Sequence, residues 1–280
     1  LANPGGVVSD LEALSAIARE AEIPLIVDNT MATPYLCPAF RWGADLIVHS
    51  TTKFLSGNGT SVGGCVVDSG TFDWTRTDKF PALSQPEPAY HGLVFAETFG
   101  DMAFTTHAHA VGLRDLGATM APMNAFQTLL GIETLALRME RHCANALAVA
   151  RFLEQHDEVA WVSYAGLESS PYHALARKYL PKGAGSVFTF GVKGGYEMGI
   201  KVVENCELFS HLANIGDTRS LILHPASTTH RQLSDEQRVA AGAGPDVIRL
   251  SIGLETLDDI IADLDRALRR AATATRRAAE

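Results

Sequence analysis

Cysteine is scarce in this sequence, and long runs of one residue character are missing. The four cysteines among 280 residues lie far apart, with no C-x-x-C pair; they are Cys37, Cys65, Cys143 and Cys206. This spacing predicts reduced thiols in a cytoplasmic protein rather than a disulfide framework or a zinc site. The net charge is −9 without a long basic run, so we expect neither nucleic acid nor an anionic membrane as a partner. Apolar runs are too short for a membrane span, and we expect no signal peptide.

The length of the chain indicates about two domains, which together can bury a core without disulfides or metals. A periodic apolar stretch over residues 125–153 predicts one long helix or two abutting helices. We place the domain boundary inside this stretch, at Cys143. We therefore expect a large domain in residues 1–143 and a smaller α+β domain in residues 144–280.

Two short apolar runs, at residues 25–28 and 45–50, predict buried strands of a parallel sheet. Ligands of such sheets bind beyond the carboxyl ends of the strands. Polar side chains follow each run at that position; they are Asp28, Ser50, Thr52 and Lys53. These residues are therefore expected to share one rim of the sheet.

The rim has the groups that pyridoxal phosphate requires. A lysine at the mouth of an apolar sheet is partly desolvated, which lowers its pKa and leaves an amine that can condense with an aldehyde. The cofactor also needs a carboxylate for its ring nitrogen and hydroxyl donors for its phosphate. Taken singly, Asp28 has an ordinary explanation as a turn former and Lys53 as a solvated loop residue.

The residue order of the two segments favours a cofactor site over these ordinary explanations. Val-Asp-Asn-Thr at residues 27–30, and His-Ser-Thr-Thr-Lys-Phe at residues 49–54 with the lysine 25 positions after Asp28, resemble the signature of the Cys/Met-metabolism family of pyridoxal-phosphate enzymes. The resemblance implies an α/β protein of the PLP-dependent transferase fold type I, with a mostly parallel large-domain sheet and a smaller C-terminal α+β domain. It implies that Lys53 is the catalytic lysine that forms the Schiff base, and that Asp28 binds the ring nitrogen. Ser50 and Thr52 would bind the phosphate, and Asn3 the ring hydroxyl.

The second half holds the residues expected to bind the substrate. The segment 248–255, Ile-Arg-Leu-Ser-Ile-Gly-Leu-Glu, resembles the family's site for the substrate α-carboxylate. Arg249 would grip that group with two hydrogen bonds. Ser220 looks like a second carboxylate contact, although a strand hydroxyl satisfied by the backbone is the ordinary explanation.

Residues 85–92, Gln-Pro-Glu-Pro-Ala-Tyr-His-Gly, are similar to a segment of the O-acetylhomoserine sulfhydrylase branch. The resemblance implies a transferase of methionine biosynthesis that converts O-acetyl-L-homoserine and sulfide, or a thiol, to L-homocysteine, or methionine, and acetate. Cystathionine γ-synthase and γ-lyase activities of the same family are alternatives, and acetyl or succinyl leaving groups both stay open. The resemblance also implies a homo-oligomer, typically a tetramer with sites between subunits, and a further N-terminal segment that precedes Leu1.

Other chemistries have weaker support. The glycines at 57, 59 and 63 do not fit the dinucleotide pattern G-x-G-x-x-G. The pattern G-x-S-x-G around Ser61 gives a serine hydrolase as a remote alternative, but that motif needs a strand before it and a helix after it. His107 and His109 alternate as metal ligands can, yet no third ligand is apparent, so we expect no metal.

The remaining elements are expected as follows. Prolines at positions 81, 86 and 88 interrupt residues 68–124 and predict a loop-rich segment. The expected strands of the second half are residues 186–192, 219–224 and 247–253, and the expected helices are residues 200–213 and those after Thr256.

Overall fold

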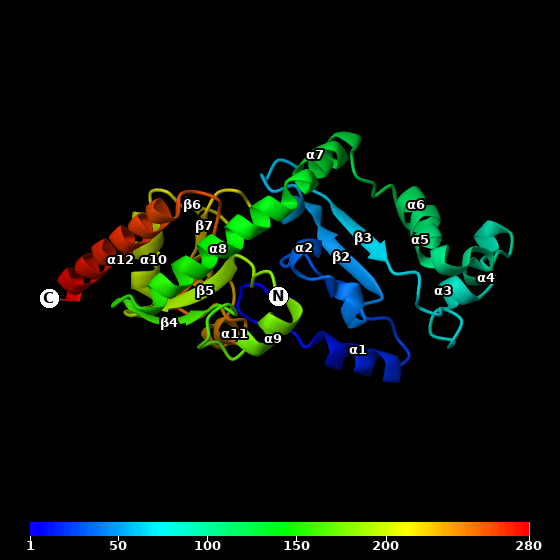
Figure 1. The fold of residues 1–280 in the computed structure, drawn as a ribbon, viewed down its shortest axis with the longest axis horizontal. Helices are drawn as coiled ribbons and strands as arrows, with labels where there is room; N and C mark the ends of the chain where they lie inside the picture. The colour runs from blue at the N-terminus through cyan, green and yellow to red at the C-terminus, as the bar shows by residue number, and fades with distance from the viewer. Residues whose placement is uncertain (280) are drawn as a thin grey trace.

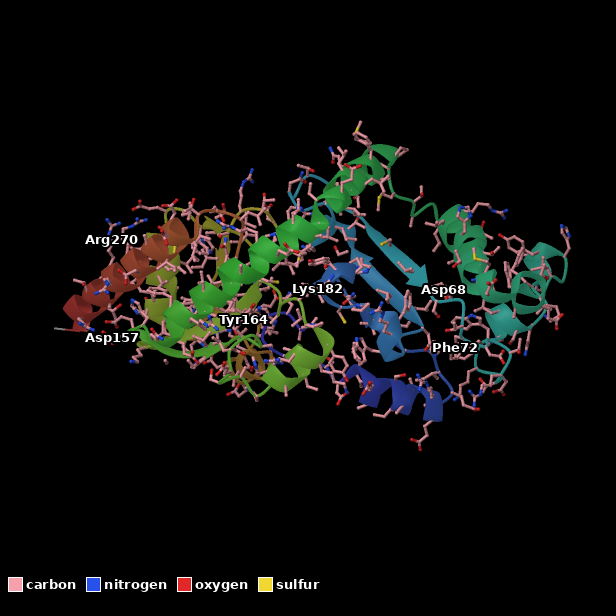
Figure 2. All side chains as sticks on the ribbon, viewed as in Figure 1. Asp68, Phe72, Asp157, Tyr164, Lys182 and Arg270 are labelled. Carbon is pink, nitrogen blue, oxygen red and sulfur yellow. The ribbon has the colours of Figure 1, made fainter. Side chains whose placement is uncertain are left out.

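Two β-sheets joined by a long helix make up the molecule (Figure 1). The computed structural model describes residues 1–279, with side chains through Arg276. A three-stranded sheet has the order β1-β2-β3, and a five-stranded sheet has the order β4-β5-β8-β7-β6. Side chains of Asp68 and Phe72 lie toward one end of the molecule, and those of Asp157 and Arg270 lie toward the other (Figure 2). The structure thus confirms an α/β architecture.

The three-stranded sheet is mixed. Its strands are β1 (Ile26–Asp28), β2 (Leu46–Ser50) and β3 (Gly64–Asp68). β1 and β2 pair in parallel, whereas β2 and β3 pair antiparallel. The expectation that both predicted strands are buried was wrong for β1, because Ile26 is 56% exposed. Within residues 1–279, β1 pairs with β2 alone and keeps one open edge.

Short helical segments surround this sheet. They are α1 (Leu11–Glu20), α2 (Thr33–Leu36), η1 (Ala39–Trp42), η2 (Thr51–Leu55), α3 (Pro81–Ser84), η3 (Pro88–Tyr90), α4 (Phe95–Phe99), η4 (Gly100–Met102), α5 (Ala103–His107), η5 (Ala108–Leu113) and α6 (Arg114–Leu116). The expectation of a loop-rich segment at residues 68–124 was therefore only partly right. Aromatic side chains give this segment its own small core, in which Trp74 stacks on Phe104 with ring centroids 5.5 Å apart.

Two abutting helices, α7 (Pro122–Glu133) and α8 (Leu135–Glu154), follow. They separate at Thr134, where φ is −105° and ψ is 5°. The structure thus confirms two abutting helices, the second of the two alternatives predicted for residues 125–153. α8 runs from α7, beside the first sheet, to the side of the second sheet (Figure 1). Cys143 lies inside α8, and the domain boundary placed there stays a prediction.

The larger hydrophobic core includes the five-stranded sheet and continues to Ile47 of β2 and Phe54. The strands of the five-stranded sheet are β4 (Val159–Ser163), β5 (Val187–Val192), β6 (Ser210–His211), β7 (Leu221–Leu223) and β8 (Val247–Ser251). All six residues of β5 are buried. The helices and turns of this half are α9 (His173–Tyr179), α10 (Gly195–Asn205), η6 (Pro225–Ser227), α11 (Asp235–Ala240) and α12 (Leu257–Ala279). α12 packs against α10 and α8, while α8 packs on β4 and α10 packs on β5 and β8.

The helix expected at residues 200–213 was placed too late. α10 begins at Gly195 and ends at Asn205. The carboxylate of Asp263 on α12 accepts hydrogen bonds from the backbone N–H groups of Glu207 (3.0 Å) and Leu208 (2.9 Å). These N–H groups are therefore unavailable to a continuing helix, and the chain enters β6 instead. Among residues 1–279, no helix is both long and apolar enough to cross a bilayer.

Candidate active site

Lys53 lies in a wide, π-type helical turn directly after β2. The turn is closed by hydrogen bonds from Ser56 N to Thr51 O (3.1 Å) and from Gly57 N to Lys53 O (2.8 Å). The Lys53 side chain is half-buried. Burial lowers the pKa of its amine, and the positive charge of Arg249 lowers it further. The turn thus holds an amine with increased nucleophilic character at the carboxyl edge of the sheet.

Asp28 lies at the same edge. The parallel register pairs Asp28 with Val48, so Asp28 and Ser50 lie on the same face of the sheet. Ser50 N donates to Thr30 Oγ1 at 2.8 Å, and Thr30 N donates to Asp28 Oδ1 at 3.0 Å. The segment after β1 is therefore tied to the segment that leads to Lys53, as the parallel arrangement requires.

A hydrogen-bonded chain connects three of the predicted residues. Lys53 Nζ donates to Asn214 Oδ1. Arg249 Nη2 donates to the backbone carbonyl of Asn214 at 3.2 Å, and Arg249 Nη1 donates to Asn3 Oδ1 at 3.2 Å. Residues from both sheets and from the first residues of the chain thus meet at one place.

Asn214 was not predicted as a site residue, because it directly follows the residues predicted as a helix. In the structure it precedes a turn at Gly216, where φ is +72°. A side chain at Gly216 would place its Cβ 2.9 Å from Phe54 N, so only glycine allows this loop to approach the Lys53 turn. The sequence Asn-Ile-Gly-Asp at residues 214–217 could have indicated a turn here.

The two predicted phosphate-binding residues differ in their surroundings. Thr52 Oγ1 accepts from Gly63 N at 3.1 Å and donates to Gly63 O at 3.3 Å. Ser50 is half-buried, and its hydroxyl bonds to no other described residue. Ser50 thus keeps its hydroxyl open to a ligand, whereas Thr52 also holds the chain that leads into β3.

Ser220 is fully buried and does not meet Arg249. Its hydroxyl donates to Glu255 Oε2 at 2.8 Å and accepts from Gly253 N at 2.9 Å. Arg249 pairs with Leu223 across the β7-β8 ladder, three residues along from Ser220. This separation is about 10 Å along a strand. The structure gives the Ser220 hydroxyl a structural role, and its contact with a substrate stays a prediction.

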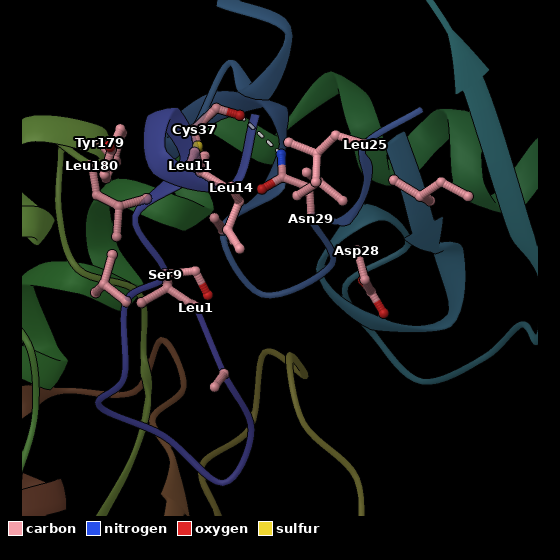
Figure 3. A pocket seen from close by; sticks show the side chains of 15 residues that line it. Leu1, Ser9, Leu11, Leu14, Leu25, Asp28, Asn29, Cys37, Tyr179 and Leu180 are labelled. Atoms are coloured by element: carbon pink, nitrogen blue, oxygen red, sulfur yellow. Dashed lines mark hydrogen bonds between the residues drawn. The ribbon is translucent and has the colours of Figure 1, made fainter. Parts of the chain in front are cut away.

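A cavity of about 200 Å³ adjoins Asp28 (Figure 3). Apolar side chains of α1 and β1, together with Leu1 and Tyr179, form most of its wall. Lys53, Ser50 and Thr52 do not line this cavity. It is therefore separate from the hydrogen-bonded chain through Asn214.

The alternative chemistries receive no support from the geometry. A loop precedes Ser61 and β3 follows it, and the buried Ser61 hydroxyl has no hydrogen-bond partner among the described residues. His107 ends α5 and His109 lies in η5. Residues 1–279 contain no group of three side chains placed to hold a metal ion.

Known proteins resemble this chain along nearly all its length. The profile of the Cys/Met metabolism PLP-dependent enzyme family matches residues 1–269. An O-acetyl-L-homoserine sulfhydrylase of Leptospira meyeri is 49% identical over 278 residues, which are 96% of this chain and 63% of that protein. A homocysteine synthase of Schizosaccharomyces pombe is 48% identical over 270 residues, again 96% and 63%. This chain therefore spans less than two thirds of the length of these relatives.

A solved structure gives the same answer for the fold. The crystal structure of a protein described as an O-acetylhomoserine (thiol)-lyase, from Campylobacter jejuni, superposes with a TM-score of 0.92 at 43% identity. The match covers 96% of this chain and 64% of that one. That protein carries a pyridoxyl-lysine phosphate at one lysine. The fold class predicted from the sequence is thereby confirmed, and the chain belongs to the Cys/Met metabolism family of PLP-dependent enzymes.

Proposed function

We propose that this chain carries the cofactor and substrate residues of a PLP-dependent transferase. The reaction replaces the acyloxy group of O-acetyl-L-homoserine by sulfide or a thiol and yields L-homocysteine or methionine and acetate, as in methionine biosynthesis. The observation that carries the proposal is the chain Lys53–Asn214–Arg249–Asn3. It joins an amine with a lowered pKa to a guanidinium that can bind a carboxylate.

The residues present fit pyridoxal phosphate. Bound pyridoxal phosphate supplies an aldehyde that condenses with amines and a protonated ring that accepts electrons from carbanions. Lys53 offers the amine, and Asp28 at the neighbouring strand end offers a carboxylate for the ring nitrogen. The open Ser50 hydroxyl and the Thr52 hydroxyl offer donors for a phosphate on the same edge. Asn3, which accepts a hydrogen bond from Arg249, would contact the ring hydroxyl.

Each of these residues has a distinct task in the proposed reaction. Lys53 moves protons at its Nζ, because a pKa lowered by burial allows the amine to accept and release a proton near working pH. Arg249 orients the amino-acid substrate through the α-carboxylate and keeps its own charge despite the burial that lowers its pKa. Asn214 holds the Lys53 amine and, through its backbone carbonyl, the Arg249 side chain.

We also propose that the protein works as a homo-oligomer, as a tetramer by analogy with its family, in the cytoplasm. Large apolar side chains exposed on α7, such as Phe126 at 55% and Leu129 at 62%, support an additional covering surface. The four cysteines are free, which fits a reducing compartment. A mass measured by light scattering that equals one chain would contradict the oligomer.

Borohydride reduction tests the proposed cofactor site. The purified protein, incubated with pyridoxal phosphate, is expected to absorb visible light and, after reduction, to carry the cofactor on the peptide that contains Lys53. A Lys53→Ala variant is expected to lose both the adduct and homocysteine formation. Lys182→Ala, which alters a lysine over the Tyr35 ring, serves as the control that keeps both.

Two results would overturn the proposal. One is a reduced adduct that persists in the Lys53→Ala variant. The other is labelling of Ser61 by a fluorophosphonate probe together with ester hydrolysis, which would favour the hydrolase alternative.

A further inference from the structure

Three polar side chains are buried along one stripe of α8. Arg138 is 8% exposed, His142 0% and Asn145 2%. Their spacing of four and three residues places them one above the other on a helix face. Such a stripe normally holds apolar residues, so each buried polar group requires hydrogen-bond partners.

The Arg138 guanidinium donates to three backbone carbonyls and, through Nε, to Thr134 Oγ1 at 3.1 Å, and within residues 1–279 it pairs with no carboxylate. Its Nη1 donates to Phe54 O at 2.8 Å, and its Nη2 donates to Gly131 O at 2.6 Å and to Leu55 O at 3.4 Å. Phe54 and Leu55 end the helical turn that contains Lys53, where carbonyls lack N–H partners within the turn. The guanidinium of Arg138 therefore completes the hydrogen bonding of the residues that follow Lys53.

The approach of Arg138 to this turn is close. A side chain at Gly57 would place its Cβ 2.4 Å from Arg138 Nη1, so the backbone of the turn lies directly against the guanidinium. The ring of His142, one helical turn later, packs edge-on against Phe54 with centroids 5.3 Å apart. The residue next to Lys53 is thus held at its carbonyl and at its ring by the same helix.

The other end of the stripe binds the chain that leaves β8. His142 Nδ1 donates to Ile252 O at 2.7 Å, and Asn145 Nδ2 donates to Gly253 O at 3.0 Å and Glu255 O at 3.1 Å. β8 carries Arg249. One rigid helix face therefore contacts the end of the Lys53 turn and the end of the Arg249 strand, about 10 Å apart along its axis.

We propose that Arg138 is a positioning residue for Lys53 and that Asn145 is a positioning residue for the Arg249 strand, so that α8 sets the distance between the amine and the carboxylate-binding guanidinium. This inference rests on the proposed function. Neither side chain contacts a reacting atom; both act through backbone carbonyls. Loss of either one is expected to affect only the end of the site that it holds.

The loss of Arg138 and the loss of Asn145 are expected to have different effects on catalysis. Without Arg138, the Lys53 turn loosens and admits water, which raises the pKa of Lys53 toward its ordinary value because burial is the main cause of its lowering. A misplaced amine reduces kcat. Without Asn145, the Arg249 strand end loosens and substrate binding weakens, which raises KM.

The test uses the full chain with Arg138→Gln, Arg138→Lys and Asn145→Ala, and with Arg151→Gln on the exposed surface of α8 as the control. Reaction of Lys53 with trace acetic anhydride as a function of pH, measured by mass spectrometry of its peptide, reports the pKa of Lys53 without any cofactor. We expect Arg138→Gln to raise this pKa toward its ordinary value and to lower kcat about 10-fold or more with KM nearly unchanged. Arg138→Lys, which keeps a charged donor, should recover part of both.

For Asn145→Ala we expect KM to rise about 10-fold and the Lys53 titration to stay unchanged. An unchanged Lys53 titration in Arg138→Gln, or equal effects of Arg138→Gln and Asn145→Ala on kcat and KM, would overturn the inference. Failure of the proposed function is distinguishable, because it appears as an unaltered protein without a borohydride adduct on Lys53. The titration decides the role of Arg138 in either case.

Discussion

The two sheets of this protein are built from similar apolar strands but differ in how they are covered. In the five-stranded sheet, Phe188 and Leu250 are fully buried. In the three-stranded sheet, Ile26 and Val66 are 56% and 55% exposed. Helices α8 and α10 pack on the five-stranded sheet, whereas β1 of the three-stranded sheet keeps an open edge within residues 1–279. A β-branched run therefore indicates a strand that favours burial, and the surrounding elements decide how much burial it receives.

The two sheets also supply different residues to the candidate site. The less covered sheet presents Lys53 and Asp28 at its edge, where a ligand can reach them. The better covered half supplies Asn214 and Arg249, which hold or face the lysine. The lysine proposed to react thus receives its hydrogen-bond partner, Asn214, from the better covered half.

Truncation of a core side chain should give the largest contrast between the two sheets. Phe188→Ala removes a fully buried ring and is expected to lower the free energy of unfolding by about 3–5 kcal/mol. Ile26→Ala is the matched change in the other sheet and should cost less than about 1 kcal/mol, because more than half of Ile26 is already in water. Urea unfolding measures both. Equal losses would show that the exposed face of β1 is covered in solution.

Acid should weaken the junction between the sheets by a somewhat smaller amount. Burial lowers the pKa of His142 to about 4, below its ordinary value of about 6.5. The unfolded chain therefore binds a proton more readily, and the stability that neutral His142 contributes is present above pH 6.5 and lost as the pH falls toward 4. The linked loss is about 3 kcal/mol. In His142→Gln, the unfolding midpoint should depend less on pH over this range; an identical dependence would exclude His142 as its source.

The smallest effect is expected at the edge of the five-stranded sheet. Trp161 on β4 is 39% exposed, and its Nε1 donates to Asp246 Oδ2 at 2.9 Å. Trp161→Phe removes this hydrogen bond and keeps an aromatic ring, so the loss should be about 1 kcal/mol or less. Thermal unfolding can measure it. A loss comparable to that of Phe188→Ala would mean that edge and centre of this sheet are equally important.

Much of the fold could be predicted from the sequence. The runs at residues 25–28 and 45–50 predicted β1 and β2, and the paired apolar helices were predicted because their pattern repeats over several turns. The end of α10 could not be predicted, because it depends on the carboxylate of Asp263, more than fifty residues away. The small helices between residues 68 and 124 were missed since prolines and glycines hide short segments that aromatic packing stabilises.

The candidate site was predictable only in part. Lys53, Asp28 and Arg249 occur in long motifs with a family resemblance, so the local sequence was enough to identify them as candidates. Asn214 and Arg138 lie in no such motif, and each forms hydrogen bonds with residues from a distant part of the chain. Their roles depend on which carbonyl or amine they meet, and sequence spacing does not contain that information.

The sequence by itself determined which residue types could do chemistry and which strands carry them, because side-chain alternation and strand ends follow from local backbone geometry. Only the tertiary structure decided that one helix face holds both the lysine turn and the arginine strand. Hydrogen bonds to backbone carbonyls have no preference for residue type on the accepting side, so the folded arrangement alone specifies them.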